Sequence, residues 1–402
     1  MHNIIITKPY RFVPPARSGF WPRLLWRVLP RYLNRSHGAE SLESLGADRL
    51  KASLDARHAI VLTPNHCRPC DPFILGLLSN QLAQPVYLMA SWHLFQQGRI
   101  QAWLLRHMGV FSVYREGMDR ESLKFAIQVV ADAERPLVLF PEGVITRAND
   151  RLNHLMEGTA FLARNAAKQR AAKVPGGRVV IHPIAIRYFF RGNIEAAVTP
   201  VLEEIERRLT WRTRQHTPLL ERMTRIGNAL LTLKEIEYLG RQQTLEIGPR
   251  LKALIDALLV PLEKEWLKGK HDGDVVARVK SIRAAMLPEM IAGELTEVER
   301  VRRWEQIADT YLAQQVHFYP PEYFGSHPSP EQLLETVERF EEDLTDTVRL
   351  HRPIHAVLQV GEAITVDPVR DRHAETDPLM ARLRTDLETM LGQLKERKPP
   401  PL

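Results

Sequence analysis

Between Leu50 and Phe190, short apolar runs rich in β-branched residues alternate with segments of helical periodicity. The apolar runs predict strands at 59–63, 86–90, 110–114, 137–140 and 179–189. The periodic segments predict helices at 72–83, 92–108, 119–134 and 156–172. This alternation is typical of an α/β fold, with a mixed, mostly parallel sheet flanked by helices. In such a sheet, ligands bind beyond the ends of the strands.

The pattern changes after about residue 203, where strand signals stop and long amphipathic helices take over. We expect helices at 219–238, 251–267, 275–291, 298–316 and 331–349. Strand signals return at 356–360 and 364–366, and a last helix is expected at 378–395. The simplest account is an α/β domain that accepts a large all-helical insertion. The expected divisions are a basic arm at 1–45, the first part of the α/β domain at 46–202, the insertion at 203–352, and the final strand and helix at 353–402.

The positive charge of the chain is concentrated at its N-terminus. The net charge is +7, from 55 basic and 48 acidic residues. The first 39 residues hold seven of the basic residues and no acid, so the rest is balanced at 48 against 48. The seven are Lys8, Arg11, Arg17, Arg23, Arg27, Arg31 and Arg35. The mixed charges elsewhere give no footprint for nucleic-acid binding.

The arm has the pattern of a helix that lies in a membrane interface. From Gly19 to Leu33, arginines recur every four residues beside a face of Trp, Phe and Leu, and Pro30 is expected to kink or shorten the helix. The alternative is a helix packed on the core of its own domain, with its arginines in water. No segment reads as a membrane span or as a signal peptide. We therefore expect a peripheral membrane protein on the cytoplasmic face, and two cysteines fit a reducing compartment.

The first chemical motif is Asn65-His66-Cys67-Arg68-Pro69-Cys70-Asp71, directly after the strand expected at 59–63. Asp71 precedes a proline, so an extended Asp71 that caps the following helix is one interpretation. In the other interpretation, the loop lets Asp71 fold back onto His66. A histidine held by a carboxylate is an oriented general base, which can take a proton from a hydroxyl group. His66 and Asp71 are the candidate catalytic residues.

Two further strand ends supply candidate binding residues. Phe140-Pro141-Glu142-Gly143 follows a buried strand, where Glu142 could accept hydrogen bonds from substrate hydroxyls and Gly143 would let a ligand approach the backbone. The strand expected at 110–114 delivers Arg115 at its end, where an arginine suits a phosphate. An ordinary turn and a solvated arginine are the plainer interpretations.

These strings, in this order, resemble the phospholipid and glycerol acyltransferase family, which includes the lysophosphatidic acid acyltransferases. His66 and Asp71 match its first signature, 109–115 the second, 140–143 the third, and 180–186 the fourth. The resemblance implies that His66 is the base and that Asp71 orients it. It implies that Arg115 holds the acceptor's phosphate and that Glu142 and Gly143 line the glycerol site. It also implies acyl-CoA or acyl carrier protein as donor, a lysophospholipid acceptor, no cofactor and no metal.

The chain departs from the family pattern in three places. Tyr114 stands where an acidic or amide residue usually precedes the arginine, and Val144-Ile145 separate the third block from Thr146-Arg147. Arg147 or Arg151 would have to replace the usual second phosphate contact. The helical insertion lies outside the common pattern, and its helices are expected to pack on one another or on a second subunit as a homo-oligomer.

Two other functions compete with the acyltransferase. Cys67 and Cys70, separated by two residues, could form a thiol–disulfide redox pair, or a metal set together with His66 and Asp71. Cysteines at a helix start are more often small buried residues. A membrane adaptor that keeps an acyltransferase fold without catalysis is the other alternative, although such a scaffold has no need of His66, Asp71 and Glu142.

Overall fold

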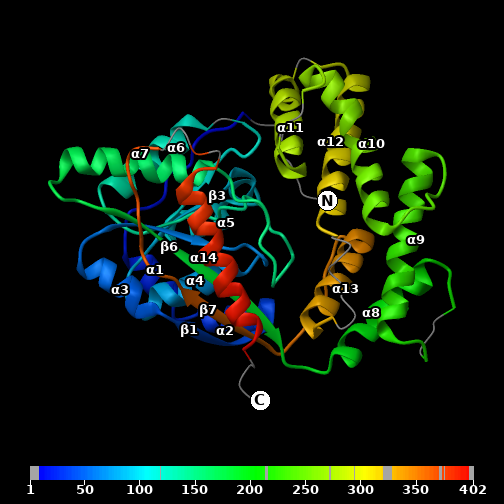
Figure 1. The fold of residues 1–402 in the computed structure, drawn as a ribbon, viewed down its shortest axis with the longest axis horizontal. Coiled ribbons are helices and arrows are strands. Elements are labelled where there is room, and N and C mark those ends of the chain that lie inside the picture. The colour runs from blue at the N-terminus through cyan, green and yellow to red at the C-terminus, as the bar shows by residue number, and fades with distance from the viewer. Residues whose placement is uncertain are drawn as a thin grey trace. The chain divides into compact units, whose positions relative to one another are not determined.

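The computed structural model describes residues 9–117, 119–212, 216–270, 273–293, 295–319, 328–370, 374 and 376–397. Lys8 of the basic arm lies outside these residues. The chain divides into two compact units (Figure 1). The α/β unit comprises 11–114, 119–192 and the chain from 350 onward, and the helical unit comprises 193–349 with the short segments 9–10 and 115–117. The helical unit starts at residue 193 rather than 203 because helix α8, Ile194–Arg208, already belongs to it.

The α/β unit contains one mixed sheet of eight strands in the order β1-β7-β6-β2-β5-β3-β4, with β8 paired to β6. The strands are β1 Ala39–Leu45, β2 Ala59–Pro64, β3 Tyr87–Ser91, β4 Val110–Val113, β5 Leu137–Val138, β6 Val179–Phe190, β7 Ile354–Val360 and β8 Ile364–Thr365. Among the strands that the structure describes, only the pairings of β6 with β7 and of β6 with β8 are antiparallel. The predicted fold class, a mixed and mostly parallel sheet with flanking helices, is confirmed.

Both chemical motifs leave the sheet at the same edge because their strands run parallel. β2 pairs with β5, with Val61 opposite Leu137 and Leu62 opposite Val138. β2 also pairs with β6 along its whole length, from Ala59 to Pro64. The carboxyl ends of neighbouring parallel strands lie side by side, so the loop after β2 meets the loop after β5.

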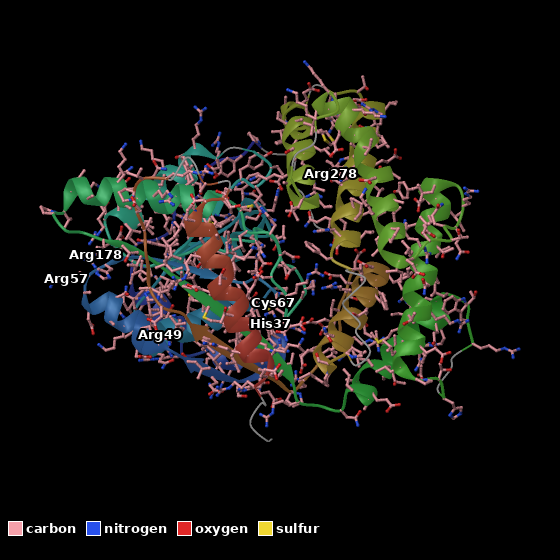
Figure 2. The ribbon with its side chains drawn as sticks, in the orientation of Figure 1. His37, Arg49, Arg57, Cys67, Arg178 and Arg278 are labelled. Carbon is pink, nitrogen blue, oxygen red and sulfur yellow. The ribbon has the colours of Figure 1, made fainter. Side chains whose placement is uncertain are left out.

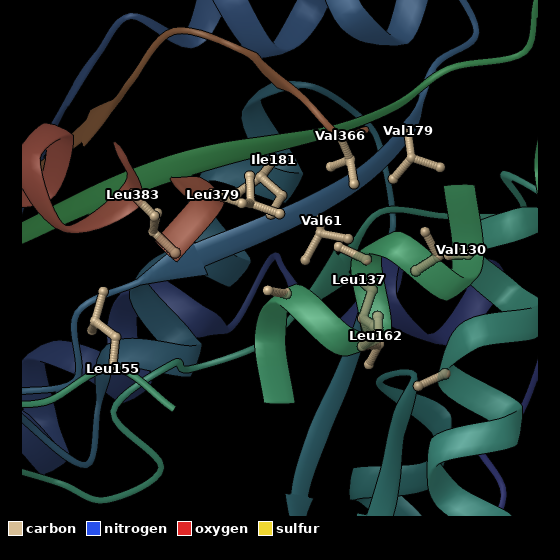
Figure 3. Packing of buried hydrophobic residues seen from close by; sticks show 14 of the residues in the cluster. Val61, Val130, Leu137, Leu155, Leu162, Val179, Ile181, Val366, Leu379 and Leu383 are labelled. Atoms are coloured by element: carbon tan, nitrogen blue, oxygen red, sulfur yellow. The ribbon is translucent and has the colours of Figure 1, made fainter. Parts of the chain in front are cut away.

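Helices cover the sheet and close the core of the α/β unit. They are α3 Ala47–Asp55, α4 Asp71–Gln81, the short 3₁₀ helix η1 Trp92–Gln96, α5 Arg99–His107, α6 Arg120–Ala131, α7 Gly158–Lys173 and α14 Pro378–Lys395. α14 packs on β6 and α7, and α7 packs on α6. Figure 3 shows strand residues such as Val61 and Ile181 in one apolar cluster with Leu162 of α7 and Leu383 of α14. Burial of this kind contributes roughly 25 cal/mol per Å² of apolar surface.

The N-terminal arm forms two short helices, α1 Phe20–Leu25 and α2 Leu29–His37. Pro30 lies in the first turn of α2, where a proline costs no hydrogen bond, so the break falls just before it. The apolar residues of the arm divide into two sets. Trp26, Leu29 and Leu33 are buried against the α/β unit, whereas Phe20, Leu24, Val28 and Tyr32 are exposed.

The helical unit contains only helices among its described residues. They are α8 Ile194–Arg208, α9 Leu219–Leu239, α10 Ile247–Leu267, α11 Val275–Ala292, α12 Glu297–His317 and α13 Pro330–Thr345. α9 to α12 share an apolar core that includes Leu254, Ile282 and Met286. Residues 320–327, between α12 and α13, lie outside the described residues.

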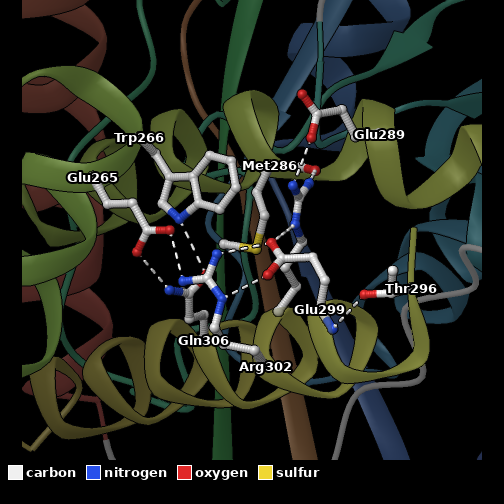
Figure 4. A network of polar contacts seen from close by, with 9 residues as sticks. Glu265, Trp266, Met286, Glu289, Thr296, Glu299, Arg302 and Gln306 are labelled. Atoms are coloured by element: carbon white, nitrogen blue, oxygen red, sulfur yellow. Dashed lines mark hydrogen bonds and ion pairs between the residues drawn. The ribbon is translucent and has the colours of Figure 1, made fainter. Parts of the chain in front are cut away.

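An ionic network ties three helices of this unit together (Figure 4). Arg302 of α12 binds Glu299 and Glu265, and Arg303 binds Glu299 and Glu289. These hydrogen bonds from the two arginines lower the pKa of Glu299 to about 2. Glu299 therefore keeps its charge well into acid solution.

The structure contains three elements that the sequence pattern did not predict, namely β1, α3 and α8. β1 has the sequence Ala-Glu-Ser-Leu-Glu-Ser-Leu, which lacks the apolar run expected of a strand. This sequence is tolerated in a strand because β1 lies at the edge of the sheet and pairs with β7 on one side only. An edge strand buries less side-chain surface, so its sequence carries less of the strand pattern.

Candidate active site

The candidate site begins where β2 ends and β6 continues, paired with β7 on one side but no longer with β2 on the other. Beyond Pro64, two asparagine side chains take the place of a neighbouring strand. Asn65 accepts from Ile186 N–H at 2.7 Å and donates to its carbonyl at 3.0 Å. Asn149 does the same for Tyr188, with distances of 2.7 and 2.6 Å. β6 therefore keeps its backbone hydrogen bonds satisfied while the chain after β2 turns away into the first motif.

His66 and Asp71 are brought together as the loop interpretation required. His66 Nδ1 lies 2.9 Å from Asp71 Oδ2. The Asp71 side chain is fully buried, and the His66 side chain keeps 14% of its surface exposed. With Nδ1–H donated to the carboxylate, the lone pair of Nε2 is the one available to accept a proton.

The capping interpretation of Asp71 is wrong. Asp71 is the first residue of α4, and Cys70 occupies the cap position. The Asp71 carboxylate instead turns back to accept Arg68 N–H at 2.9 Å. A tight turn from Arg68 to Asp71 is closed by Asp71 N–H, which donates to Arg68 O at 3.1 Å. The helix therefore starts at Asp71, one residue before Pro72, although proline favours the first position of a helix.

A tyrosine from β6 completes the surroundings of Asp71. Tyr188 donates its hydroxyl to Asp71 Oδ1 at 2.6 Å. The Cys70 thiol in turn donates to Tyr188 Oη at 3.3 Å. Burial, followed by the nearby Asp71 charge, raises the pKa of Tyr188 well above its ordinary value, so the phenol stays protonated and remains a donor.

The second motif supports the backbone of the first. Glu142 accepts His66 N–H at 2.8 Å with one oxygen and Asn153 N–H at 2.9 Å with the other. Burial raises the pKa of Glu142 to about 7, although both backbone hydrogen bonds oppose that shift. The structure thus places Glu142 against the loop that carries His66, and both of its carboxyl oxygens accept hydrogen bonds from backbone N–H groups.

Neighbouring residues hold the ring and the carbonyl of His66. The Phe140 ring stacks on the imidazole, with centroids 4.0 Å apart. Thr146 donates its backbone N–H at 2.8 Å and its hydroxyl at 3.1 Å to the His66 carbonyl. Gly143 has φ +69°, and a Cβ there would lie 2.8 Å from Met156 Sδ. The turn and the packing of Met156 both require glycine at this position.

The predicted arginines lie on two different loops. Arg115 follows β4 in a loop that is fastened by Asp119, which accepts Tyr114 N–H and caps α6 through Ser122 N–H. Residues 115–117 group with the helical unit, where Arg115 and Glu116 lie within electrostatic range of Arg283. Arg147, half-buried, follows Thr146 with a positive φ of 57°, and Arg151 is exposed.

The two cysteines do not have the environment of a redox pair. Both thiols are free and buried. Burial, assisted by the Asp71 charge, raises the pKa of Cys70 to about 11, whereas a redox-active thiol needs a lowered pKa and access to solvent. Figure 2 labels both Cys67 and His37. Burial and the charge of Arg68 lower the pKa of His37. Among the described residues, no group of three or more His, Cys, Asp or Glu side chains is placed to hold a metal ion.

The sequence pattern missed Tyr188, Asn149 and the stacking role of Phe140. Tyr188 lies 117 residues from Asp71 along the chain, so no local spacing could link the two. Asn65 was part of the first motif, yet its bond to β6 depends on sheet order. The signal that was available is a polar residue within a mostly apolar strand, and Tyr188 shares that property with His182 and Arg187 in 179–190.

An oriented imidazole at the ends of parallel strands can remove a proton from a hydroxyl group and so promote an acyl transfer. The Acyltransferase family model matches residues 35–187, a range that contains both motifs, Arg115 and Arg147. No curated protein matches the chain. Residues 35–187 therefore form a domain of the acyltransferase family, and the protein is an acyltransferase enzyme.

Proposed function

We propose that the enzyme is an O-acyltransferase that moves a fatty acyl group from acyl-CoA or acyl carrier protein to a hydroxyl group of a lysophospholipid or glycerol phosphate, with 1-acylglycerol-3-phosphate as the favoured acceptor. The observation that carries this proposal is the bond between His66 Nδ1 and buried Asp71 Oδ2 at 2.9 Å, inside a domain of this family.

In the proposed mechanism His66 is the general base. Its Nε2 takes the proton of the acceptor hydroxyl while the hydroxyl oxygen attacks the thioester carbonyl carbon. The resulting tetrahedral intermediate collapses, the C–S bond breaks, and the thiolate takes the proton back from His66. The products are an ester and a free thiol, and Asp71 stabilises the imidazolium that forms between the two proton transfers.

Arg115 and Arg147 are the proposed contacts for the acceptor's phosphate, since guanidinium groups bind phosphate through paired hydrogen bonds. In this proposal the Glu142–Gly143 turn borders the glycerol part of the acceptor. Both oxygens of Glu142 already bind backbone N–H groups, so its contribution is to shape this wall.

The acyl-transfer reaction is tested with the purified full-length enzyme, a thioester donor and a panel of lysolipid acceptors, followed by lipid mass spectrometry. His66→Ala is expected to lower the rate to background while thermal unfolding is preserved. His93→Ala, at a half-buried histidine of η1, is the control and is expected to keep the wild-type rate. Equal background rates for wild type and His66→Ala would support the non-catalytic adaptor instead, and equal rates above background would refute His66 as the base.

We also propose that the enzyme binds an anionic membrane surface through its arm and α5. Phe20, Leu24, Val28 and Tyr32 repeat every four residues and are all exposed, beside the exposed arginines 23, 27 and 31. The Trp21 ring meets the Trp103 ring of α5 at 4.8 Å, which joins the arm to the exposed Ile100, Trp103 and Leu104. Exposed apolar residues beside arginines are the features of an interfacial helix. No helix among the described residues is long and apolar enough to cross a membrane.

Vesicle sedimentation tests this surface. Wild type is expected to bind vesicles that contain phosphatidylglycerol more strongly than pure phosphatidylcholine vesicles, and less strongly as salt rises. Val28→Glu should weaken binding. Val298→Glu, at an exposed valine of α12, should leave it unchanged. Equal binding by both variants would refute the proposed surface.

A further inference from the structure

Asp71 has three strong hydrogen-bond partners, and they differ in kind. His66 Nδ1 and Arg68 N–H both bind Oδ2, at 2.9 Å each. Oδ1 receives the Tyr188 hydroxyl at 2.6 Å, with only a long contact from the Cys67 thiol at 3.8 Å besides. Tyr188 is therefore the principal donor on the side of the carboxylate that faces away from the histidine.

Tyr188 is itself held in place. Its backbone is fixed between Ala356 of β7 and the Asn149 side chain. Its hydroxyl accepts from Cys70 at 3.3 Å, and the Arg68 guanidinium lies over its ring at 5.5 Å from the centroid. The side chain is almost completely buried. A phenol so constrained has one direction in which to donate its proton, and Asp71 lies there.

We propose that Tyr188 is a positioning residue of the His66–Asp71 base, fixing the Asp71 carboxylate and moderating how strongly it holds a proton on His66. This inference rests on the proposed role of His66 as base. Tyr188 lies one position beyond the segment that matches the family model, which ends at residue 187. The role comes from the hydrogen bonds in this chain.

Removal of the hydroxyl has two physical consequences. The carboxylate loses one of the contacts that fix its plane, so the imidazole is oriented less often. The carboxylate also keeps more of its negative charge and attracts a proton on His66 more strongly. A hydrogen bond to a charged group is stronger than one between neutral groups. Relaxation of the site recovers part of the lost hydrogen bond, so we expect kcat in Tyr188→Phe to fall about tenfold with little change in KM.

The pH dependence separates this role from a merely structural one. In Tyr188→Phe the acidic limb of the kcat/KM profile should move to higher pH, because a higher pH is needed to free His66 of its proton. Replacement of Tyr188 by 3-fluorotyrosine keeps the shape and makes the phenol a stronger donor. That replacement should move the limb to lower pH, and it covers the case in which the phenylalanine variant fails to fold.

Tyr87→Phe is the matched control. Tyr87 is equally buried in the same sheet and donates its hydroxyl to a different carboxylate, Glu134, at 2.5 Å. It should lose a comparable amount of stability with an unchanged pH profile. Identical profiles and rates for Tyr188→Phe and Tyr87→Phe would overturn the inference.

NMR titration of His66 in the substrate-free enzyme keeps the two proposals apart. The His66 resonances should titrate at higher pH in Tyr188→Phe than in wild type, and at an unchanged pH in Tyr87→Phe. This readout requires no activity. If His66→Ala were fully active, the proposed function would fail while the titration still tested the link from Tyr188 to His66. An unchanged titration in Tyr188→Phe would reject that link even if His66 proved essential.

Discussion

Both units of this enzyme bury carboxylates, but they partner them in opposite ways. In the helical unit the buried acids face arginines, as in the pairs Glu206–Arg222, Glu235–Arg250 and Glu263–Arg278. In the α/β unit the two acids of the site, Asp71 and Glu142, are held by backbone N–H groups, a histidine and a phenol. The arginines neutralise the buried acids of the helical unit, whereas these partners of Asp71 and Glu142 in the site include no guanidinium group.

If Asp71 has the role proposed above, the difference follows from what each carboxylate has to do. An arginine fixes a carboxylate in one ionised state, since its guanidinium does not lose its proton in the physiological range. Beside His66, such a permanent positive charge would oppose formation of the imidazolium. Neutral donors orient Asp71 without that opposition. The arginine partners of the helical unit suit carboxylates that stabilise the fold. The neutral donors around Asp71 suit a carboxylate that supports the proposed proton transfer.

The largest expected effect is on Asp71. Asp71→Asn keeps an acceptor for Tyr188 or Arg68 but removes the negative charge that holds Nδ1–H, and kcat should fall by about 10³–10⁴-fold. Asp377, equally buried in the same unit but paired with Arg164, provides the contrast. Asp377→Asn should cost stability and leave kcat of the folded enzyme unchanged. Steady-state kinetics beside thermal unfolding measures both, and a similar loss of kcat in the two variants would break the comparison.

Breaking a buried ion pair in the helical unit should show the reverse pattern. Arg250 binds Glu235 through two hydrogen bonds, at 2.8 and 2.9 Å, and also contacts Asn228 and Thr232. Arg250→Met leaves Glu235 buried and unpaired, which costs about 3–5 kcal/mol. Urea unfolding followed by circular dichroism measures the loss. A fall in kcat at full folding would show that this unit takes part in the chemistry.

The two kinds of carboxylate should also respond oppositely to pH. Burial raises the pKa of Glu142 from its ordinary value of 4.5 to about 7 in the folded protein. The stabilisation that this shift gives to the folded state is therefore complete below pH 4.5 and is lost as pH rises through 7. The span corresponds to about 3 kcal/mol at most. Burial raises the pKa of Glu235, but hydrogen bonds from Arg250 and Gln243 outweigh burial and lower it overall, so its contribution is present above 4.5 and is lost in acid.

Glutamine variants isolate the pH-dependent contributions of Glu142 and Glu235 to the free energy of unfolding. Relative to Glu142→Gln, the wild type should lose stability between pH 4.5 and 7. Relative to Glu235→Gln, the wild type should gain stability as pH rises from strongly acidic values to 4.5 and above. Urea unfolding at a series of pH values gives both slopes. Slopes of the same sign would mean that the partners do not distinguish the two acids.

The smallest effect is expected for an exposed pair on the same helix as Arg250. Lys252 and Asp256 are one turn apart, 2.8 Å between charged atoms, with the lysine side chain 80% exposed. Such pairs contribute about 0.3–0.5 kcal/mol. Lys252→Ala should therefore be nearly neutral in urea unfolding. A loss comparable to that of Arg250→Met would mean that burial is not what separates strong pairs from weak ones.

Sequence reasoning predicted the sheet-forming runs and most helices because apolar periodicity is a local property. It also identified His66 and Asp71, since their spacing and the strand end before them are local as well. It could not identify Tyr188 or Asn149, whose roles arise only when β6 lies beside β2. Glu142 was located by its motif but was expected to face substrate, and its two backbone hydrogen bonds became apparent only in three dimensions. The roles of Arg115 and Arg147 stay predictions.

Asn65 and Asn149, which bind β6 beyond the end of β2, have a consequence for how the loop from 65 to 71 can vary. Each amide offers one donor and one acceptor in the spacing of a peptide group, so each stands in for a residue of an absent neighbouring strand. The backbone hydrogen bonds of Ile186 and Tyr188 therefore depend on Asn65 and Asn149 and not on the identity of the side chains at 67–70. Side-chain exchanges at 67–70 should leave those hydrogen bonds in place, provided that both amides remain. An aspartate at position 65 or 149 would place a carboxylate oxygen against the carbonyl of Ile186 or Tyr188, and that carbonyl would lose its hydrogen bond.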